Sequence, residues 1–137
     1  MNSPLERSFE FFANAENLDL ITPPWLRFNM LTKSPITMSR GTEIQYRLRI
    51  HRIPVSWRSE ISIWDPPYRF VDRQRSGPFK DWSHLHEFST DYSGGTLIRD
   101  QVEYRVPLGK IVHSMFVGSD LLNIFRFRNQ QVEKILS

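Results

Sequence analysis

The C-terminal segment 109–136 constrains the fold of this chain most, because its apolar residues recur at helical spacing. Steps of three and four residues place these positions on one side of a helix: Ile111, Met115, Gly118, Leu122, Phe125, Val132 and Leu136. Four neighbours widen that side (Phe116, Leu121, Ile124 and Phe127), and five charged residues lie largely off it: Asp120, Arg126, Arg128, Glu133 and Lys134. The pattern predicts a long helix, divided near Gly118 into a short lead-in turn and a main part capped by Ser119 or Asp120. Such an apolar helix needs a concave partner.

Residues 42–106 change to a period of two, which is typical of half-buried antiparallel strands. In the first strand, apolar residues from Ile44 to Ile50 alternate with polar residues from Gln45 to His51. In the second, the predicted inward residues are Val55, Trp57, Ser59, Ile61 and Ile63. Turns rich in proline and glycine separate five predicted strands, which cover residues 42–51, 55–63, 68–75, 81–89 and 96–106. This run of strands is the partner that the helix requires.

The N-terminal part predicts two short helices. Ser3 serves as the expected N-cap of the first helix, with Pro4 at its first position and Glu6 completing a capping box. A second short helix covers residues 18–21 and ends at two prolines, after which an extended segment is predicted from Trp25 onward. Helices, strands and the C-terminal helix together predict one α+β domain over residues 1–137.

Composition limits the classes of function. The chain has 137 residues, of which 39% are hydrophobic, enough for one sizeable core. No apolar run approaches the roughly 20 residues of a membrane span, and no leader pattern precedes the first helix, so we expect a cytoplasmic protein without membrane insertion. The absence of cysteine excludes disulfides and thiolate catalysis. Fourteen of the 18 basic residues are arginine, but acidic residues are interleaved with them, so no nucleic-acid partner is expected.

Several short motifs occur in an order that resembles a known superfamily. They are the segment 20–28 (Leu-Ile-Thr-Pro-Pro-Trp-Leu-Arg-Phe), Phe70-Val71-Asp72 with Gly77-Pro78, Trp82-x-His84-x-His86-x-Phe88, Asp100-x-Val102-x-Tyr104 and Pro107-Leu108-Gly109. This order resembles the START-like, helix-grip superfamily (SRPBCC), which includes polyketide cyclases/dehydrases and lipid-transfer proteins, and in particular its bacterial ligand-binding members. The resemblance implies a curved antiparallel sheet around a long C-terminal helix, with a ligand between them.

The resemblance also implies a strand before the first helix, for which residues 1–3 leave almost no room. We therefore expect either a sheet that lacks this strand or a chain that continues before residue 1. A missing strand would leave an edge open to pairing, so the oligomeric state is not predicted.

Two cross-strand pairs of histidine and aspartate are predicted beneath the helix. If Phe88 faces inward, period two places Trp82, His84 and His86 on the same face. By the same argument Phe70 brings in Asp72 and Gln74, and Ile98, Val102 and Tyr104 bring in Asp100. The hairpin turns then set Asp72 opposite His84 and His86 opposite Asp100, close enough for contact. A slip of one residue would turn either set outward.

These polar residues permit three interpretations. They satisfy one another's hydrogen bonds inside the core, they form the polar end of a ligand cavity, or they act as a base with its orienting carboxylate. His84, His86, Asp72 and Asp100 are the catalytic candidates under the third interpretation. The same four residues would suit zinc or iron. Because the carboxylates serve equally as hydrogen-bond partners, we favour a site without metal and expect no cofactor.

The preferred hypothesis is a protein that binds a small apolar or amphipathic molecule between the sheet and the helix. The expected ligand-binding residues are Tyr46, Trp57, Asp72, Gln74, Trp82, His84, His86, Asp100, Tyr104, Met115, Phe116 and Phe125. Trp25 and Phe79 are candidate lids at the cavity mouth. One alternative is a cyclase/dehydrase-type enzyme that uses the His–Asp pairs. Another is an interaction module that uses the outer sheet face, where these arginines are predicted: Arg47, Arg49, Arg58, Arg73, Arg99 and Arg105.

Overall fold

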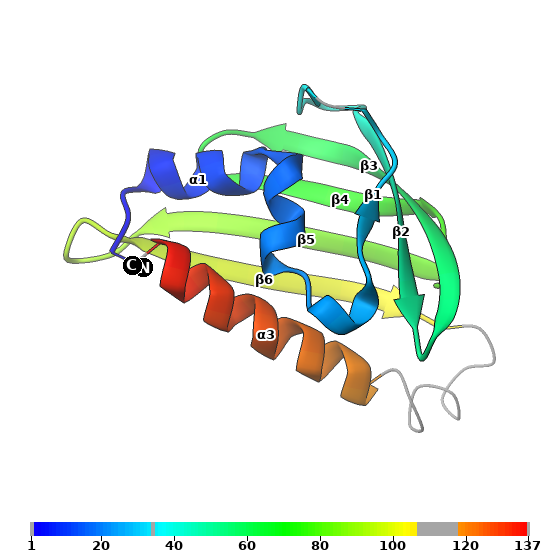
Figure 1. Ribbon diagram of the computed structural model, residues 1–137. Coiled ribbons are helices and arrows are strands. Elements are labelled where there is room, and N and C mark those ends of the chain that lie inside the picture. The colour runs from blue at the N-terminus through cyan, green and yellow to red at the C-terminus, as the bar shows by residue number, and fades with distance from the viewer. Residues whose placement is uncertain (1, 34, 107–117, 137) are drawn as a thin grey trace.

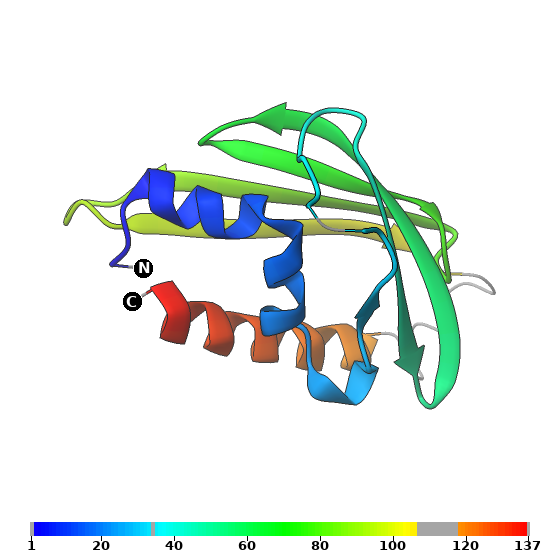
Figure 2. The same ribbon diagram turned by 45° about the horizontal axis from the view of Figure 1, so that its top comes forward.

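One antiparallel sheet with helices on its concave side makes up the fold (Figure 1). The computed structural model describes residues 2–33, 35–106 and 118–136. The strands are β1 (Asn29–Met30), β2 (Glu43–Ile50), β3 (Ile53–Asp65), β4 (Arg69–Ser76), β5 (Asp81–Thr90) and β6 (Thr96–Arg105). They pair in sequence order. Figure 2 shows how the sheet curves around the helices, which confirms the predicted α+β helix-grip fold.

The described residues also include four helical segments: α1 (Leu5–Ala13), η1 (Ala15–Ile21), η2 (Pro24–Leu26) and α3 (Gly118–Leu136). The predicted capping by Ser3 is wrong, because Pro4 occupies the N-cap position and no side chain caps the helix. Ser3 is buried instead, and its backbone N–H donates to the carbonyl of Leu136, which ties the first residues to the end of α3. The extended segment predicted from Trp25 is also wrong there, since η2 covers Trp25 and β1 begins only at Asn29.

The pairing of β3 with β4 is irregular at two places, the first between Arg58 and Ser59. The second lies between Ile61 and Ile63, and such an irregularity changes which side chains face inward. Ile63, predicted to face inward, is therefore 48% exposed, and Trp64 packs against Phe9 of α1 instead.

The main core lies where α1 covers the middle strands. Phe9 contacts Trp64, Phe70 and Phe88 with ring centroids 5.3, 5.9 and 5.3 Å apart. Val132 and Leu136, in the C-terminal half of α3, join this cluster. The N-terminal half of α3 is left to face the sheet across a cavity.

The arginines predicted on the outer face of the sheet are all exposed, although Arg49, near the end of β2, also borders the cavity. Three of them pair with acidic side chains on neighbouring strands: Arg58 with Glu43 at 3.6 Å, Arg99 with Glu87 at 3.9 Å and Arg105 with Asp81 at 2.8 Å. These pairs neutralise much of the positive charge that an interaction module would need. Among the described residues, no helix is long and apolar enough to cross a membrane.

Candidate functional site

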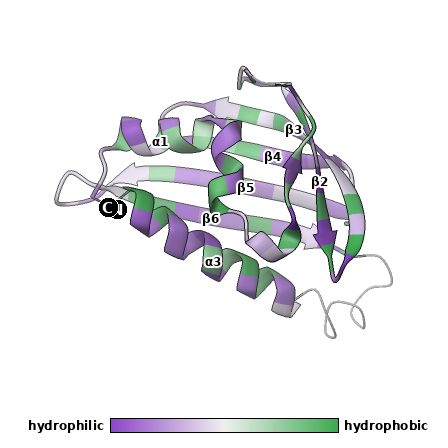
Figure 3. Cartoon of the chain, in the orientation of Figure 1, coloured by the Kyte–Doolittle hydropathy of each residue, from purple (hydrophilic) through white to green (hydrophobic). Residues whose placement is uncertain are grey.

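A cavity of about 730 Å³ lies between the curved sheet and the helices. Its apolar walls come from α1, η1, η2, α3, strands β2 to β5 and adjoining loops. They include Phe12, Leu18, Ile21, Trp25, Leu26, Phe28, Ile44, Tyr46, Leu48, Trp57, Phe79, Trp82, Leu121, Ile124 and Phe125. Four of the polar lining residues, on β4, β5 and α3, form one cluster: Asp72, His84, His86 and Arg128. Figure 3 shows hydrophilic residues on β5, beneath the helices.

The backbone register of the His–Asp pairs is as predicted, but the hydrogen bonds run diagonally. Asp72 lies opposite His84 and His86 opposite Asp100, which confirms the predicted pairing of residues. However, His84 Nε2 is 2.8 Å from Asp100 Oδ1, and His86 Nε2 is 2.6 Å from Asp72 Oδ2. Across the directly opposed pairs the distances are longer: His84 Nδ1 is 3.9 Å from Asp72 Oδ2, and His86 Nδ1 is 3.6 Å from Asp100 Oδ1. The two imidazole rings stack with centroids 3.7 Å apart, and each ring reaches the diagonal carboxylate.

Arg128 of α3 completes the network and was missed by the sequence analysis, which placed it off the apolar side of the helix. It is only 7% exposed, and its Nη2 lies 3.1 Å from Asp100 Oδ1 and 3.3 Å from His86 Nδ1. A signal for its burial was present in the sequence. Positions 125, 128, 132 and 136 follow one another at helical spacing, so Arg128 continues the stripe of Phe125 and Val132.

The partners of His86 fix where its proton lies. Arginine only donates hydrogen bonds and an ionised carboxylate only accepts them. Nδ1 of His86 therefore accepts from Arg128, and Nε2–H donates to Asp72. Burial, aided by the neighbouring His84, lowers the pKa of His86 to about 4, although the hydrogen bond to Asp72 opposes this shift. His86 is consequently neutral at pH 7.

The two carboxylates are ionised in the same network. Burial alone would raise the pKa of Asp72, but the hydrogen bond from His86 and nearby positive charge lower it overall. For Asp100, burial is likewise outweighed by the hydrogen bond from His84 and by the charge of Arg128, so its pKa is also lowered. The two negative charges of Asp72 and Asp100 therefore exceed the single positive charge of Arg128.

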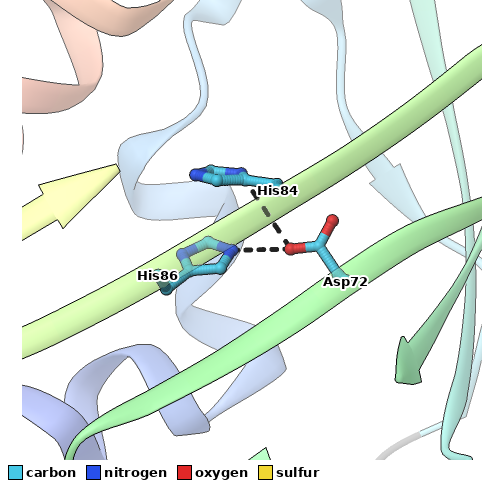
Figure 4. Close-up of side chains that lie close together, drawn as sticks. All are labelled: Asp72, His84 and His86. Carbon is cyan, nitrogen blue, oxygen red and sulfur yellow. Dashed lines mark hydrogen bonds and ion pairs between the residues drawn. The ribbon is translucent and has the colours of Figure 1, made fainter. Parts of the chain in front are cut away.

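A metal ion would require this network to rearrange. Asp72, His84 and His86 each offer a ligand atom, and these atoms lie within 4.8 Å of one another (Figure 4). The rings are nearly parallel, with an interplanar angle of 27°, so their lone pairs run side by side rather than converging on one point. In addition, the tautomer set by Arg128 places a proton on the His86 nitrogen that faces Asp72. The described geometry fits hydrogen bonding better than metal coordination.

The network also has the parts of a general base. Asp100 accepts from Nε2–H of His84, which leaves Nδ1 as the acceptor when that ring is neutral. A carboxylate that orients an imidazole in this way is a common catalytic arrangement. His84 lines the cavity, so a bound molecule would lie beside it.

Three aromatic residues named from the sequence form one wall of the cavity. The ring of Trp57 lies 5.9 Å from Tyr46 and 5.1 Å from Trp82. Burial and, less strongly, Asp72 raise the pKa of the Tyr46 phenol, while its hydrogen bond with Ser59 opposes the shift. Phe79, a predicted lid, packs 4.8 Å from Trp82 within the same wall. The other predicted lid, Trp25, is 55% exposed and contacts Phe127.

Gln74 anchors a turn and is not among the residues that line the cavity. Its side-chain amide donates to the carbonyl of Phe79 at 2.7 Å and accepts from the N–H of Phe79 at 3.1 Å. Gly77 permits this contact, since a Cβ there would lie 2.6 Å from Gln74 Oε1. Gln74 therefore holds Phe79 in the aromatic wall.

The remaining predicted residues lie elsewhere. Asp100 and Tyr104 line a second hollow, of about 490 Å³, between β6 and α3. Phe125 lines both spaces, and its ring contacts His84 at 5.6 Å. Met115 and Phe116 lie outside the described residues, as does the predicted lead-in to α3.

Comparison with known proteins establishes the fold. No family model and no curated protein matches the sequence. Among solved structures, protein CV1439 from Chromobacterium violaceum matches with a TM-score of 0.74 at 12% identity, covering 99% of this chain and 91% of that one. Ginseng major latex-like protein 151 from Panax ginseng matches with a TM-score of 0.71 at 14% identity, covering 100% and 92%. Protein Ms6760 from Mycobacterium smegmatis matches with a TM-score of 0.69 at 16% identity, covering 99% and 85%.

These likenesses place the chain in the class of START-like, helix-grip folds, as the order of its motifs predicted. The sequence identities to these three proteins are below 20%, so the comparisons show the fold and not the activity.

Proposed function

We propose that this protein binds a small apolar or amphipathic molecule in the cavity between its sheet and α3. The observation that carries the proposal is the cavity itself, whose volume of about 730 Å³ falls within the usual range for small-molecule sites. Its walls are mainly aromatic and aliphatic, and they include one cluster of convergent polar groups, Asp72, His84, His86 and Arg128. This combination favours an apolar body with a polar substituent.

The hydrogen-bond network indicates which substituent suits that cluster. The side chains of the network already bond to one another, so they are held in position before a ligand arrives. In Figure 4 one oxygen of Asp72 faces both histidines and the other is directed away from them. An ionised carboxylate oxygen accepts hydrogen bonds only. A hydroxyl or amine on the ligand would therefore pair there better than a second carboxylate.

A fluorescence titration tests the binding proposal. N-phenyl-1-naphthylamine is uncharged, apolar and brighter in apolar surroundings, and we expect saturable binding of one molecule per chain. Ile124 lines the cavity from α3, so Ile124→Trp should fill the space and reduce binding at least tenfold. Leu122→Trp is the matched control, because Leu122 lies on the same helix, is 59% exposed and does not line this cavity. Absence of binding, or equal binding by both variants, would count against the proposal.

A second candidate function, catalysis of the cyclase/dehydrase type, is favoured by the orientation of His84. Its Nε2–H is held by Asp100, so Nδ1 is the atom that would remove a proton from a bound carbonyl compound. Mass spectrometry of a captured molecule over time separates the two functions. A binding protein returns the molecule unchanged, whereas an enzyme converts it and loses that conversion in His84→Gln.

A further inference from the structure

The rim of the cavity carries three exposed arginines. Arg27 follows η2, Arg49 lies near the end of β2, and Arg52 lies in the turn between β2 and β3. All three line the cavity. Figures 1 and 2 show η2, the β2–β3 turn and the first residues of α3 meeting at the same end of the molecule. Within the described part of the chain, no carboxylate pairs with these arginines. The nearby Asp120 of α3 engages His51, at 2.8 Å.

Two of these arginines adopt a backbone conformation that is costly for them. The described residues other than glycine with positive φ are Arg27 at 51°, His51 at 50° and Arg52 at 69°. Since Ile50 pairs with Ile53, His51 and Arg52 are the two central residues of the hairpin turn. Asn-Gly is the pair that such turns prefer. Long side chains at these positions indicate a requirement for the side chains themselves, as is usual where strain gathers at a functional site.

The charge of the rim is opposite to that of the buried network. At the rim, the three positive charges of the arginines exceed the single negative charge of Asp120. Inside, the two negative charges of Asp72 and Asp100 exceed the single positive charge of Arg128. A ligand with an anionic group would be repelled at the network and attracted at the rim. The molecule is thus polarised to accept an amphipathic anion in one orientation.

We propose that Arg27, Arg49 and Arg52 bind the anionic group of the ligand, a carboxylate, sulfonate or phosphate, while its apolar body occupies the cavity. This inference rests on the proposed function and specifies its ligand class. Arginine suits the task because its planar group donates to such anions through two hydrogen bonds at once.

Two probes that share an aromatic body test this selectivity. 8-Anilinonaphthalene-1-sulfonate carries a sulfonate, and N-phenyl-1-naphthylamine is the same scaffold without it. We expect the Arg49→Gln/Arg52→Gln variant to bind the sulfonate probe about tenfold more weakly, with unchanged affinity for the neutral probe. Arg49→Lys/Arg52→Lys should retain most of the binding, and added salt should weaken only the anionic probe. Arg73→Gln, at an exposed arginine that does not line the cavity, is the control.

The possible outcomes distinguish a failure of the proposed anion selectivity from a failure of the proposed ligand binding. If the glutamine variant binds both probes as the wild type does, or binds both more weakly by the same factor, the rim does not select anions. Binding of the neutral probe by the wild type would still support the proposed function. If neither probe binds the wild type, the proposed function fails and the inference fails with it. Binding to anionic vesicles is measured as a further test. If the rim variant loses vesicle binding while its preference between the probes is unchanged, the rim serves a membrane surface and the inference is overturned.

Discussion

At the scale of single residues, the buried network depends on Arg128. Its guanidinium is the group that α3 contributes to the network, and it donates both to Asp100 and to His86. Within the described structure, Nε of Arg128 has no hydrogen-bond partner. The guanidinium is therefore positioned by its bonds to Asp100 and His86, although this leaves one of its N–H groups unpaired. Removing a buried charge of this kind leaves an uncompensated partner behind, which costs more than the pair itself contributes.

Arg128→Met should destabilise the fold by about 3 kcal/mol, because Asp100 loses its guanidinium partner while remaining largely shielded from water. Arg128→Lys should recover little of this loss, since a single ammonium group does not reproduce the guanidinium's contacts. Urea unfolding measures both variants. Arg126→Met, at an exposed position of the same helix, is the control and should change stability by less than about 0.5 kcal/mol. Equal effects of Arg126→Met and Arg128→Met would refute this role of Arg128.

His86 should make the stability of the protein depend on pH in the acid range. Its pKa is lowered from 6.5 to about 4 in the folded protein, so between these values the unfolded chain binds a proton that the folded chain does not. Stability from this group is therefore complete above pH 6.5 and falls as the pH drops toward 4, by on the order of 3 kcal/mol. Asp72 and Asp100, whose pKa values are lowered from 3.8, extend the loss to still lower pH.

Urea unfolding at several pH values tests this dependence. His86→Gln should show a flatter profile between pH 6.5 and 4, whatever its stability at pH 7. A His86→Gln profile as steep as that of the wild type would assign the acid sensitivity to other groups.

The sequence predicts the inward residues of the site better than their partners. Period two was sufficient to turn His84 and His86 inward and to set them opposite Asp72 and Asp100. Which carboxylate each ring engages depends on how the two rings stack, a side-chain property that periodicity does not encode. Arg128 was placed off the apolar side of the helix, although its spacing follows the buried stripe.

At the scale of elements, α1 is held to the sheet mainly by aromatic rings. Leu5, Phe9 and Phe12 recur at helical spacing and are all buried. Phe9→Ala should cost about 3–5 kcal/mol, because it empties a site enclosed by Trp64, Phe70 and Phe88.

Thermal unfolding checks the Phe9 prediction. Leu20→Ala, at a residue that is 54% exposed, serves as the control and should leave the midpoint nearly unchanged. A shift for Phe9→Ala no larger than that of Leu20→Ala would show that α1 contributes little to the core.

Element order and type were predictable, whereas local irregularities were not. The long alternating segments gave each of the strands β2 to β6, because period two persists over many residues. The register shift near Ile63 and the short helix η2 arise from pairing and packing with distant residues. The N-cap at Pro4 likewise reflects the bond between Ser3 and Leu136, which no local pattern contains.

At the scale of the whole molecule, the core and the cavity occupy different parts of the same interface between helices and sheet. The C-terminal half of α3 packs with α1, and its N-terminal half borders the open space. A molecule that fills this space binds only the folded state, so it should raise the unfolding midpoint. At a concentration 100 times its Kd, the expected stabilisation is about 2.7 kcal/mol.

Thermal unfolding with saturating N-phenyl-1-naphthylamine tests this linkage. The midpoint of the wild type and of Leu122→Trp should rise, and that of Ile124→Trp should stay where it is without the probe. A rise of equal size in Ile124→Trp would locate the binding outside the cavity.

Native mass spectrometry of the purified protein tests the central claim most directly. We predict a complex of one chain with one organic molecule of a few hundred daltons, released on denaturation and absent from Ile124→Trp. Its fragmentation would identify the class of the ligand and show whether it carries the anionic group that the rim arginines require. A bare chain that also fails to take up N-phenyl-1-naphthylamine would contradict the assignment of the cavity as a binding site.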